Sequence, residues 1–302
     1  MKILVTGGSG FVASHIVDKL ISTGHKVIVI DNLTNSTKTN TNPKAVLIKK
    51  SILDDLSKEF SGVDIVIHHA AQVSVTKSIE DPMFDAKINI LGTLNILEHC
   101  RKYGVKKIIY ANSGGAAAGD NTNMVTEESP IKPLCPYGVS KHTIEHYLFV
   151  YNHLYGLKYT SLRYANVYGP RQSPKADGGV VAIFINKMLK NEQPIIYGNG
   201  NQTRDLVYVE DVADANILAL TKGDNDCFNI STGKDISINL LFQTVKKITG
   251  YKKEPIYKPS RKGEIIRSVL DCSKANKMLG WKSRTSLENG LKATIEFNKR
   301  VS

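Results

Sequence analysis

The sequence predicts an α/β fold in which a doubly wound parallel sheet is joined to a smaller, interleaved C-terminal α/β region. Short β-rich runs alternate with helical patterns through the first half of the chain, and a glycine-rich turn links the first run to the first helical pattern. Alternation of this kind, with right-handed crossovers, places the strands parallel and the helices on both faces of one sheet. After about residue 164 the chain changes to turn-rich segments, which predicts the smaller region.

The strands of the sheet are predicted from nearly continuous apolar runs, which are typical of strands buried on both faces. These runs are Ile3–Thr6, Val27–Ile30, Val46–Ile48, Ile65–His68, Ile108–Ala111 and Thr160–Arg163. Between them, apolar residues at helical spacing predict helices over Val12–Ile21, Ile90–Cys100 and Lys141–Leu154, and Gly24 is a stop signal for the first.

In the second half, short helices are predicted around Ala182–Lys190, Val212–Leu220 and Ile238–Thr249, between glycine-containing turns. A chain of 302 residues can bury one large core or two coupled cores. We therefore expect a larger domain over residues 1–165 and a substrate-binding region over residues 166–302 that is interleaved with the first.

The composition excludes several classes of protein. No apolar run approaches the roughly 20 residues that a membrane helix needs, and the start of the chain lacks the apolar region of a signal peptide. The four cysteines are scattered and form no CxxC pair, which predicts neither a zinc site nor a disulfide framework. We expect a cytoplasmic protein with no membrane partner and no metal.

The net charge of +12 is compatible with nucleic acid, a membrane surface or an anionic metabolite as a partner. The lysines are dispersed and no nucleic-acid motif is present, so no nucleic acid is expected. Only eight of the 40 basic residues are arginine, and Arg171, Arg204 and Arg261 lie in glycine-containing, loop-like segments. Guanidinium groups suit bidentate contacts with phosphate, which indicates a phosphorylated ligand.

The glycine-rich turn has the context of a Rossmann-type dinucleotide site, because it follows a strand, opens a helix and precedes the strand-end acid Asp31 by about 20 residues. Gly7 permits the tight turn, Gly10 lets the backbone approach a pyrophosphate, and Ala13 allows close packing. The free N–H groups of the helix then face the phosphates. A carboxylate at Asp31 accepts both ribose hydroxyls and repels a 2′-phosphate, so NAD is predicted rather than NADP.

Tyr137 and Lys141 stand four residues apart and share one face of a predicted helix. A phenol with a pKa of about 10 is a poor base at neutral pH. A nearby ammonium and the positive nicotinamide ring both favour the phenolate, so the pair is suited to moving a proton. His68 and His69 are adjacent at a strand end and face opposite sides, which argues against a shared metal.

With these motifs in order, the chain resembles the extended short-chain dehydrogenase/reductase superfamily, in its NAD-dependent epimerase/dehydratase branch. The resemblance covers nearly the whole chain. It is carried by Thr6–His15, Asp31–Leu33, His69–Gln72, Asn89–Thr93, Tyr137–Lys141, Arg163–Arg171, Gly198–Asp205, Arg261–Glu264 and Leu279–Trp281.

The resemblance implies a role for each group of residues. The expected catalytic residues are Tyr137, Lys141 and Ser113. NAD is expected to contact Gly7, Gly10, Phe11, Val12, Asp31, Asn32, Ser51, Ile52, Ala70, Ala71, Gln72, Asn89, Tyr137, Lys141 and Tyr164. For the substrate it implies Asn166 at the diphosphate or uridine, Tyr197 at the uracil, Arg204 and Arg261 at the phosphates, Glu264 at the ribose and Ser268 beside the 2-substituent of the sugar.

The implied activity is NAD-dependent 4-epimerisation of a UDP-hexose, such as UDP-glucose or UDP-galactose, through a 4-keto intermediate, by a homodimer. N-acetylated sugars and uronic acids stay open. Two positions depart from the pattern: Gly114 stands where the family has Ser or Thr, and Ala118 where it has Tyr. Gly114 and Gly115 also disfavour a dehydratase, which usually carries Asp-Glu in this stretch. A 4-keto reductase and a non-catalytic NAD-binding sensor also stay open.

Overall fold

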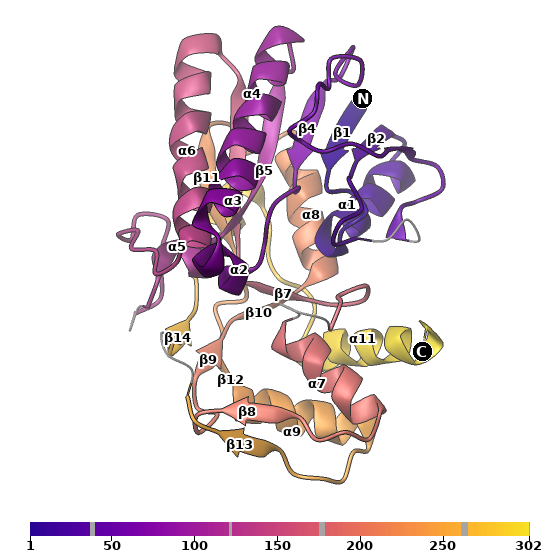
Figure 1. The fold of residues 1–302 in the computed structure, drawn as a ribbon, viewed down its shortest axis with the longest axis vertical. Coiled ribbons are helices and arrows are strands. Elements are labelled where there is room, and N and C mark those ends of the chain that lie inside the picture. Colours follow the sequence, from indigo (N-terminus) through magenta and orange to yellow (C-terminus); the bar gives the residue numbers. More distant parts are fainter. Residues whose placement is uncertain (37–39, 121–122, 175–178, 261–264, 302) are drawn as a thin grey trace.

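A seven-stranded parallel sheet forms the centre of the larger part of the molecule (Figure 1). The computed structural model describes residues 1–36, 40–120, 123–174, 179–260 and 265–301. Within them the strand order of the sheet is β11-β6-β5-β4-β1-β2-β3. The strands are β1 (Lys2–Thr6), β2 (Lys26–Ile30), β3 (Val46–Ile48), β4 (Ile65–His68), β5 (Lys107–Ser113), β6 (Lys158–Tyr164) and β11 (Asp226–Ile230). The order reverses between β1 and β4, where sheets of this type bind ligands at the carboxyl ends of the strands.

The burial of each strand follows its place in the sheet. β1 lies between β2 and β4, and the side chains of Ile3, Leu4 and Val5 are fully buried. The expectation that Val46–Ile48 is buried on both faces was wrong, because β3 is the edge strand and Val46 is 59% exposed. Its apolar composition therefore reflects β propensity rather than complete burial.

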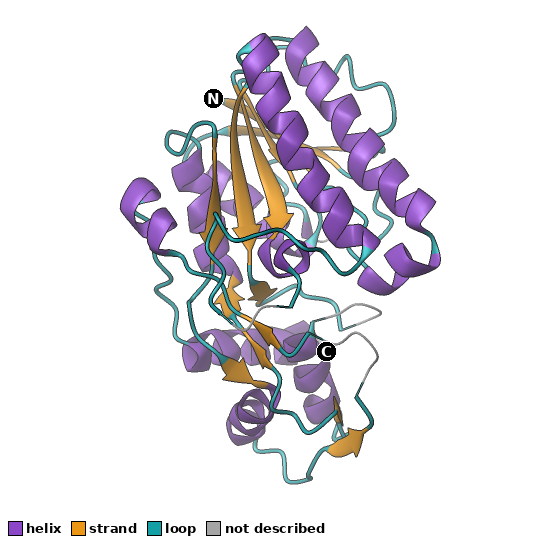
Figure 2. Ribbon diagram, turned by 90° about the vertical axis from the view of Figure 1, so that its left-hand side faces the viewer, coloured by secondary structure: helices purple, strands orange, loops and turns teal. Residues whose placement is uncertain are grey.

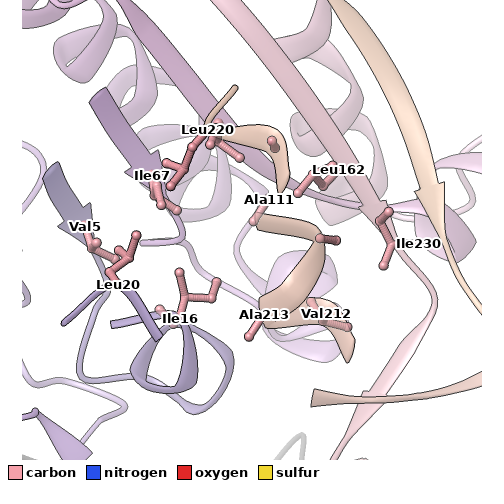
Figure 3. Packing of buried hydrophobic residues seen from close by; sticks show 14 of the residues in the cluster. Val5, Ile16, Leu20, Ile67, Ala111, Leu162, Val212, Ala213, Leu220 and Ile230 are labelled. Carbon is pink, nitrogen blue, oxygen red and sulfur yellow. The ribbon is translucent and has the colours of Figure 1, made fainter. Parts of the chain in front are cut away.

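Helices cover both faces of the sheet. α1 (Phe11–Ser22) and α8 (Val209–Ala219) pack on one face, and α4 (Gly92–Lys102) and α6 (Pro136–Tyr155) on the other (Figure 1). Figure 3 shows Ile16 and Leu20 of α1 and Val212 of α8 among side chains of the strands. Ala13, Ile16, Val17 and Leu20, the buried apolar residues of α1, are spaced so that one stripe of the helix faces the core.

Two predicted helices differ from the observed ones at their first turns. α6 begins at Pro136 rather than near Lys141, since proline is well suited to the first position of a helix and has no N–H to leave unpaired. α4 is preceded by a π-helical turn, η2 (Lys87–Leu91), where the predicted helix already began at Ile90. π-turns often mark functional positions in helices.

The second half of the chain builds the smaller part of the molecule, which lies below the large sheet in Figure 2. Three small sheets have the orders β10-β7, β12-β9-β14 and β13-β8. Their strands are β7 (Asn166–Tyr168), β8 (Ile195–Tyr197), β9 (Thr203–Arg204), β10 (Leu206–Tyr208), β12 (Ile236–Ser237), β13 (Ile256–Lys258) and β14 (Arg267–Ser268). A hydrophobic core lies between α7 (Val180–Leu189), α9 (Ile238–Thr249) and α11 (Leu287–Val301), separate from the two cores on the faces of the large sheet. The shorter helices are α2 (Val75–Glu80), α3 (Pro82–Ala86), α5 (Gly114–Ala118) and α10 (Ser273–Leu279).

The two halves of the sequence share the large sheet. β11 and α8 come from the second half of the chain, yet β11 pairs with β6 and α8 packs beside α1. β11 was not predicted, because it starts with an aspartate and contains an asparagine, so its apolar signal is short. The division into residues 1–165 and 166–302 stays a prediction. In the described part of the chain, no helix is both long enough and apolar enough to span a bilayer.

Candidate active site

The glycine-rich turn follows β1 and lies between the ends of β2 and β4. The Gly7 N–H donates to the carbonyl oxygen of Ile30 over 2.7 Å, and the Gly10 N–H donates to the Gly7 carbonyl oxygen over 2.9 Å. Gly7 has a φ of +67°, and a Cβ there would lie 2.8 Å from the backbone nitrogen of Ala70. A Cβ on Gly8 would lie 2.7 Å from Val29 Cγ1. The turn therefore needs glycine for backbone geometry and for space.

The first turn of α1 fits the phosphates of a dinucleotide. In the described residues no side chain caps the helix at Gly10, and no acid lies in the first turn. The first N–H groups are thus available to an anion, with the positive end of the helix dipole behind them. A Cβ on Gly10 would lie 3.0 Å from the Gly7 carbonyl oxygen, so this cradle stays open because the residue is glycine. Phe11 and Val12 form the start of the helix.

Asp31 follows β2 and is 7% exposed. Its Oδ2 accepts a hydrogen bond from the Ser9 N–H over 3.1 Å, and its Oδ1 accepts from the Leu33 N–H and the Ser36 hydroxyl over 2.8 and 2.7 Å. The carboxylate is thereby fixed against the glycine turn. Asn32, the next residue, caps the following turn through the Thr34 N–H. A carboxylate held in this way is expected to bind two ribose hydroxyls.

Ser51 and Ile52 lie in the loop after β3. The Ser51 N–H donates to Asp54 Oδ2 over 2.8 Å, and its hydroxyl oxygen accepts from the Leu53 N–H over 3.2 Å. The Ile52 carbonyl oxygen accepts from Asn95 of α4 over 2.8 Å. A Cβ on Gly92 would lie 2.6 Å from Ile52 Cδ1, so this side chain packs directly on α4. The adenine contact of both residues stays a prediction.

The segment Ala70–Gln72 follows β4 and is held by buried polar side chains. The Thr6 hydroxyl accepts from the Ala70 N–H over 3.1 Å. The Gln72 N–H donates to Asn89 Oδ1 over 2.8 Å, and Asn89 Nδ2 donates to the Gln72 carbonyl oxygen over 2.9 Å. Asn89 Nδ2 also lies 3.2 Å from the Ser140 hydroxyl of α6. Asn89 therefore connects the expected dinucleotide loop with the helix that carries Tyr137 and Lys141.

Tyr137 lies in the first turn of α6, opposite the end of β5. Burial raises the pKa of Tyr137 to about 12. A hydrogen bond between its side chain and that of Ser113, the last residue of β5, acts in the opposite direction and favours ionisation of the phenol. Because burial has the larger effect, the protein alone holds Tyr137 as a neutral phenol near pH 7.

Lys141 lies one turn after Tyr137 and is 4% exposed. Its Nζ lies 4.3 Å from the centre of the Tyr110 ring, which attracts a cation. Burial lowers the pKa of Lys141 to about 7, while the charges of Asp85 and Glu145 act in the opposite direction. The ammonium is therefore close to its titration point at neutral pH.

Glu145, one further turn along α6, was not predicted as part of the site. Its carboxylate forms a bidentate pair with Arg163 of β6, over 2.9 Å to Nε and 2.7 Å to the terminal nitrogen. It also accepts hydrogen bonds from Ser161 and from Asn112. Asn112 Oδ1 in turn accepts from the Ser113 N–H over 2.7 Å. This network fixes α6 against β5 and β6, and so fixes Tyr137 relative to Ser113.

The packing around Gly114 explains why glycine stands where the family has Ser or Thr. A Cβ on Gly114 would lie 2.4 Å from Leu270 Cδ1, so a serine or threonine there would collide with Leu270. A Cβ on Gly115 would lie 2.6 Å from the Ser268 hydroxyl, which places Ser268 beside the start of α5. The hydroxyl that contacts Tyr137 comes from Ser113 instead. Its catalytic role stays a prediction.

Tyr164 ends β6 on the other side of the site. Its ring lies 5.8 Å from that of His69, and its hydroxyl contacts His69 Nε2 over 3.2 Å. Asn216 of α8 donates to the same hydroxyl over 2.9 Å. Burial lowers the pKa of His69 to about 3. Both rings are therefore neutral at physiological pH. Asn216 was not predicted, because no local pattern distinguishes it from other polar residues of a helix.

The substrate residues of the second half lie on the small sheets. Arg204 and Ser268 are register partners in β9 and β14, and the side chain of Arg204 donates to the Thr203 carbonyl oxygen over 2.8 Å. The Asn166 N–H donates to the Asp205 carbonyl oxygen over 3.0 Å. Tyr197 ends β8. The position of Ser268 beside Gly115 brings β14 next to the Tyr137 region. Arg261 and Glu264 lie outside the described residues.

His68 provides a pH-dependent prediction. Its ring bonds Thr6 Oγ1 over 2.6 Å and Thr93 Oγ1 over 2.9 Å, and burial holds its pKa well below the usual value of 6.5. Below pH 6.5 the unfolded chain takes up a proton that the folded chain does not, so stability falls as the pH falls. His68 contributes about 1.4 kcal/mol per pH unit to this slope below pH 6.5, and His69, whose pKa burial also lowers, adds a similar amount. Urea unfolding between about pH 5 and 7.5 should show the sum of the two contributions in the acid part of this range. His68→Gln should be less stable at the upper end of that range but have a flatter profile. An equal slope in both proteins would contradict the assignment.

The chain matches the NAD dependent epimerase/dehydratase family over residues 3–231. It is similar to UDP-glucose 4-epimerase from Mycolicibacterium smegmatis, with 38% identity over 100% of both chains. A crystal structure of UDP-glucose 4-epimerase from Thermotoga maritima with UDP-glucose is 50% identical, with a TM-score of 0.98 over 100% of this chain and 99% of that one. The UDP-N-acetylglucosamine 4-epimerase of Methanobrevibacter ruminantium, in complex with UDP-N-acetylmuramic acid, is 36% identical, with a TM-score of 0.96 over 100% and 99%.

Proposed function

The chain belongs to the NAD dependent epimerase/dehydratase family, and we propose that it inverts C4 of a UDP-hexose with NAD as cofactor, through a 4-keto sugar. The observation that carries the proposal is the contact between Ser113 and Tyr137, one helical turn from buried Lys141. These three residues lie at the carboxyl ends of the strands, where doubly wound sheets bind their ligands.

NAD is the cofactor that the glycine turn and Asp31 fit. Bound NAD supplies the redox chemistry, because its positively charged ring takes up the C4 hydride and returns it to the opposite face of the 4-keto sugar. Asp31 is proposed to bind the adenosine ribose, the N–H groups at the start of α1 the pyrophosphate, and Lys141 the nicotinamide ribose. Tyr164, the last residue of β6, and Gln72, in the segment after β4, are proposed to line the nicotinamide half of this site.

Tyr137 is the proposed base and acid. The phenolate takes the proton from the sugar 4-hydroxyl when C4 is oxidised and returns it when C4 is reduced. The Lys141 ammonium favours the phenolate by its charge, and Ser113 donates to the oxygen that carries the negative charge. No net proton or hydride is consumed, so the cofactor is regenerated in each turnover.

The nucleotide has to hold the substrate while the 4-keto sugar turns over between two faces. Arg204 and Asn166 are proposed to contact the diphosphate, and Tyr197 the uracil. The scarcity of arginine supports this assignment for Arg204, as does its place on β9 beside Ser268 of β14. Arg261 and Glu264 stay predictions from the sequence.

The proposal is tested by incubating the purified protein with NAD and a panel of UDP-sugars. Chromatography is expected to show C4 inversion of UDP-glucose and UDP-galactose and, because Ser268 is small, also of UDP-N-acetylglucosamine. Retention of the C4 configuration in every sugar would reject the epimerase assignment. In a parallel incubation with a UDP-4-keto sugar, stoichiometric oxidation of added NADH or NADPH would favour a reductase instead.

Ser268 is proposed to set the size of the sugar that the site accepts. Replacing Ser268 with tyrosine fills the space beside Gly115 and is expected to lower kcat/KM for UDP-N-acetylglucosamine by about a hundredfold, while UDP-glucose loses less than about tenfold. Ser268→Ala is the control and should change neither value appreciably. Equal losses for the two sugars in Ser268→Tyr would show that this residue does not face the 2-substituent.

We also propose that the protein is a cytoplasmic homodimer that pairs α4 and α6. Apolar side chains on and next to these helices support it: Phe149 is 61% and Leu154 59% exposed, and Leu91 and Val139 are exposed as well. Several exposed apolar side chains on two neighbouring helices are typical of an interface. The four cysteines are free thiols, as a reducing compartment allows.

Replacing Phe149 with glutamate is expected to convert the dimer to monomer at micromolar concentration in sedimentation velocity, because it places a charge in an apolar contact. Leu240→Glu, on α9, is the control, since Leu240 is also exposed but lies outside the proposed helix pair. A parent protein that sediments as a monomer, or a Phe149→Glu variant that stays a dimer, would contradict the assignment.

A further inference from the structure

Asp85 is a buried carboxylate with one oxygen satisfied and the other without a partner. It lies in α3 and is 1% exposed. Its Oδ1 accepts hydrogen bonds from Gln72 Nε2 over 2.9 Å and from Asn89 Nδ2 over 3.0 Å. Its Oδ2 is buried and, among the described residues, has no hydrogen-bond partner. Both donors to Oδ1 are neutral amides, so nothing in this set balances the charge.

A buried carboxylate is costly unless it is paired with a positive charge. Asp85 is connected to α6 through Asn89, whose Nδ2 also contacts the Ser140 hydroxyl, and Ser140 is the residue before Lys141. Ser140 in turn donates to the Tyr137 carbonyl oxygen over 3.0 Å. The carboxylate therefore lies beside the turn of α6 that carries both members of the Tyr–Lys pair.

Of the two carboxylates whose charges act on Lys141, Glu145 is paired with an arginine and Asp85 accepts hydrogen bonds from neutral amides. Charged or titratable side chains interact with Lys141 from four elements: Asp85 of α3, Glu145 of α6, Tyr110 of β5, and His68 and His69 at the end of β4. Tyr137 lies one turn before Lys141 on α6. The two histidines are neutral, and Glu145 is already paired with Arg163. Among the described residues no carboxylate oxygen lies within 4 Å of Lys141 Nζ, so the attraction from Asp85 acts through space and is not a formed salt bridge.

We propose that Asp85 is a positioning residue whose charge keeps the Lys141 ammonium protonated, so that Tyr137 can ionise during epimerisation; this inference rests on the proposed function. Asp85 is one of the two carboxylates whose charges stabilise this ammonium, and the other, Glu145, is shared with Arg163. The hydrogen-bonded link through Asn89 and Ser140 fixes the Asp85 carboxylate relative to the turn of α6 that carries Lys141. Asp85 itself is not expected to contact the substrate or the reacting atoms.

The sign of the effect follows from the charges. Removing the negative charge of Asp85 lowers the pKa of Lys141, which is already lowered to about 7 by burial, and so removes the ammonium at alkaline pH. The Asp85 charge also raises the pKa of Tyr137, so removing it makes the phenol easier to ionise. This second effect therefore does not lower the activity of the variant at acid pH. The loss of activity is therefore confined to the alkaline side.

The test is Asp85→Asn, which keeps an oxygen for Gln72 and Asn89 and removes the charge. We expect the ratio of its kcat to that of the parent to be near one at about pH 5 and to fall to about one tenth at about pH 8.5, since an opposite charge typically shifts a pKa by at least about one unit. The control is Asp81→Asn, which removes an exposed acid from the start of the same helix and keeps the cap to Phe84. A ratio that does not depend on pH, or the same fall in Asp81→Asn, would overturn the proposal.

A second measurement does not depend on turnover. Lys141→Met leaves the Asp85 charge uncompensated, so adding Asp85→Asn to that variant is expected to raise its thermal midpoint by about 3 °C, whereas Asp85→Asn alone lowers that of the parent. Additive changes would overturn the proposal. Should Asp85→Asn not fold, recovery of folded protein in the double variant supports it and failure to recover contradicts it. A protein that is inactive on every UDP-sugar would still show this non-additive change in thermal midpoint. The measurement therefore tests the interaction of Asp85 with Lys141 separately from the proposed epimerase function.

Discussion

Replacing Tyr137 with phenylalanine is expected to lower kcat for C4 epimerisation by about a thousandfold, the range that a general acid–base group contributes. The ring stays in the first turn of α6, but the hydroxyl that contacts Ser113 is lost. With it goes the group that removes the proton from the sugar 4-hydroxyl. NAD affinity, measured by calorimetry, should change by less than about tenfold, because phenylalanine keeps the packing.

Tyr147→Phe, ten residues later on the same helix, is the control for loss of a phenol hydroxyl from α6. It should keep the kcat of the parent. An active Tyr137→Phe variant would remove the proposed base from the mechanism. A Tyr137→Phe variant could also be inactive because it no longer binds NAD. That result would show no role of Tyr137 in proton transfer and would count against the mechanism as well.

Replacing Gly7 with alanine is expected to abolish NAD binding and to lower the free energy of unfolding by about 3 kcal/mol or more. The left-handed backbone costs about 1–2 kcal/mol for a residue with a Cβ, and the added atom would lie 2.8 and 2.9 Å from backbone atoms of Ala70. Ala70 is held by the Thr6 hydroxyl and cannot move without opening the end of β4. The collision therefore distorts the turn that faces the phosphates.

Gly24→Ala separates the two costs. Gly24 has a φ of +83° but nothing within 4 Å of the added Cβ. It should therefore lose only the backbone strain of about 1–2 kcal/mol. It should also bind NAD as the parent does. Calorimetry and urea unfolding measure both quantities. Equal effects of the two substitutions would show that the space beside Ala70 is not what Gly7 provides.

The strand, turn and helix that would hold the cofactor could be predicted because their signals are local. The glycine turn, Asp31 and the strands around them lie close together in the sequence, and each has a pattern of its own. Tyr137 and Lys141 are likewise two positions on one helix. Only the start of that helix was misplaced, at Lys141 rather than Pro136.

The contacts that fix the site could not be predicted, because they join residues far apart in the sequence. Glu145 meets Arg163 and Asn112 across α6, β5 and β6, and Asn216 reaches Tyr164 over 52 residues. Asp85 lies in a short helix whose sequence shows a capping residue and a proline but no charge partner. Burial is a property of the folded chain, so a lone aspartate cannot be distinguished beforehand from a surface acid.

The most direct test of the central claim follows the hydrogen at C4. UDP-galactose carrying deuterium at C4 is incubated with the protein and NAD, and the UDP-glucose formed is analysed by NMR and mass spectrometry. We predict that the product keeps the deuterium at C4, because the hydride leaves and returns without exchange with water. Product with hydrogen from solvent at C4, or inversion without any dependence on NAD, would contradict a mechanism of oxidation and reduction at this carbon.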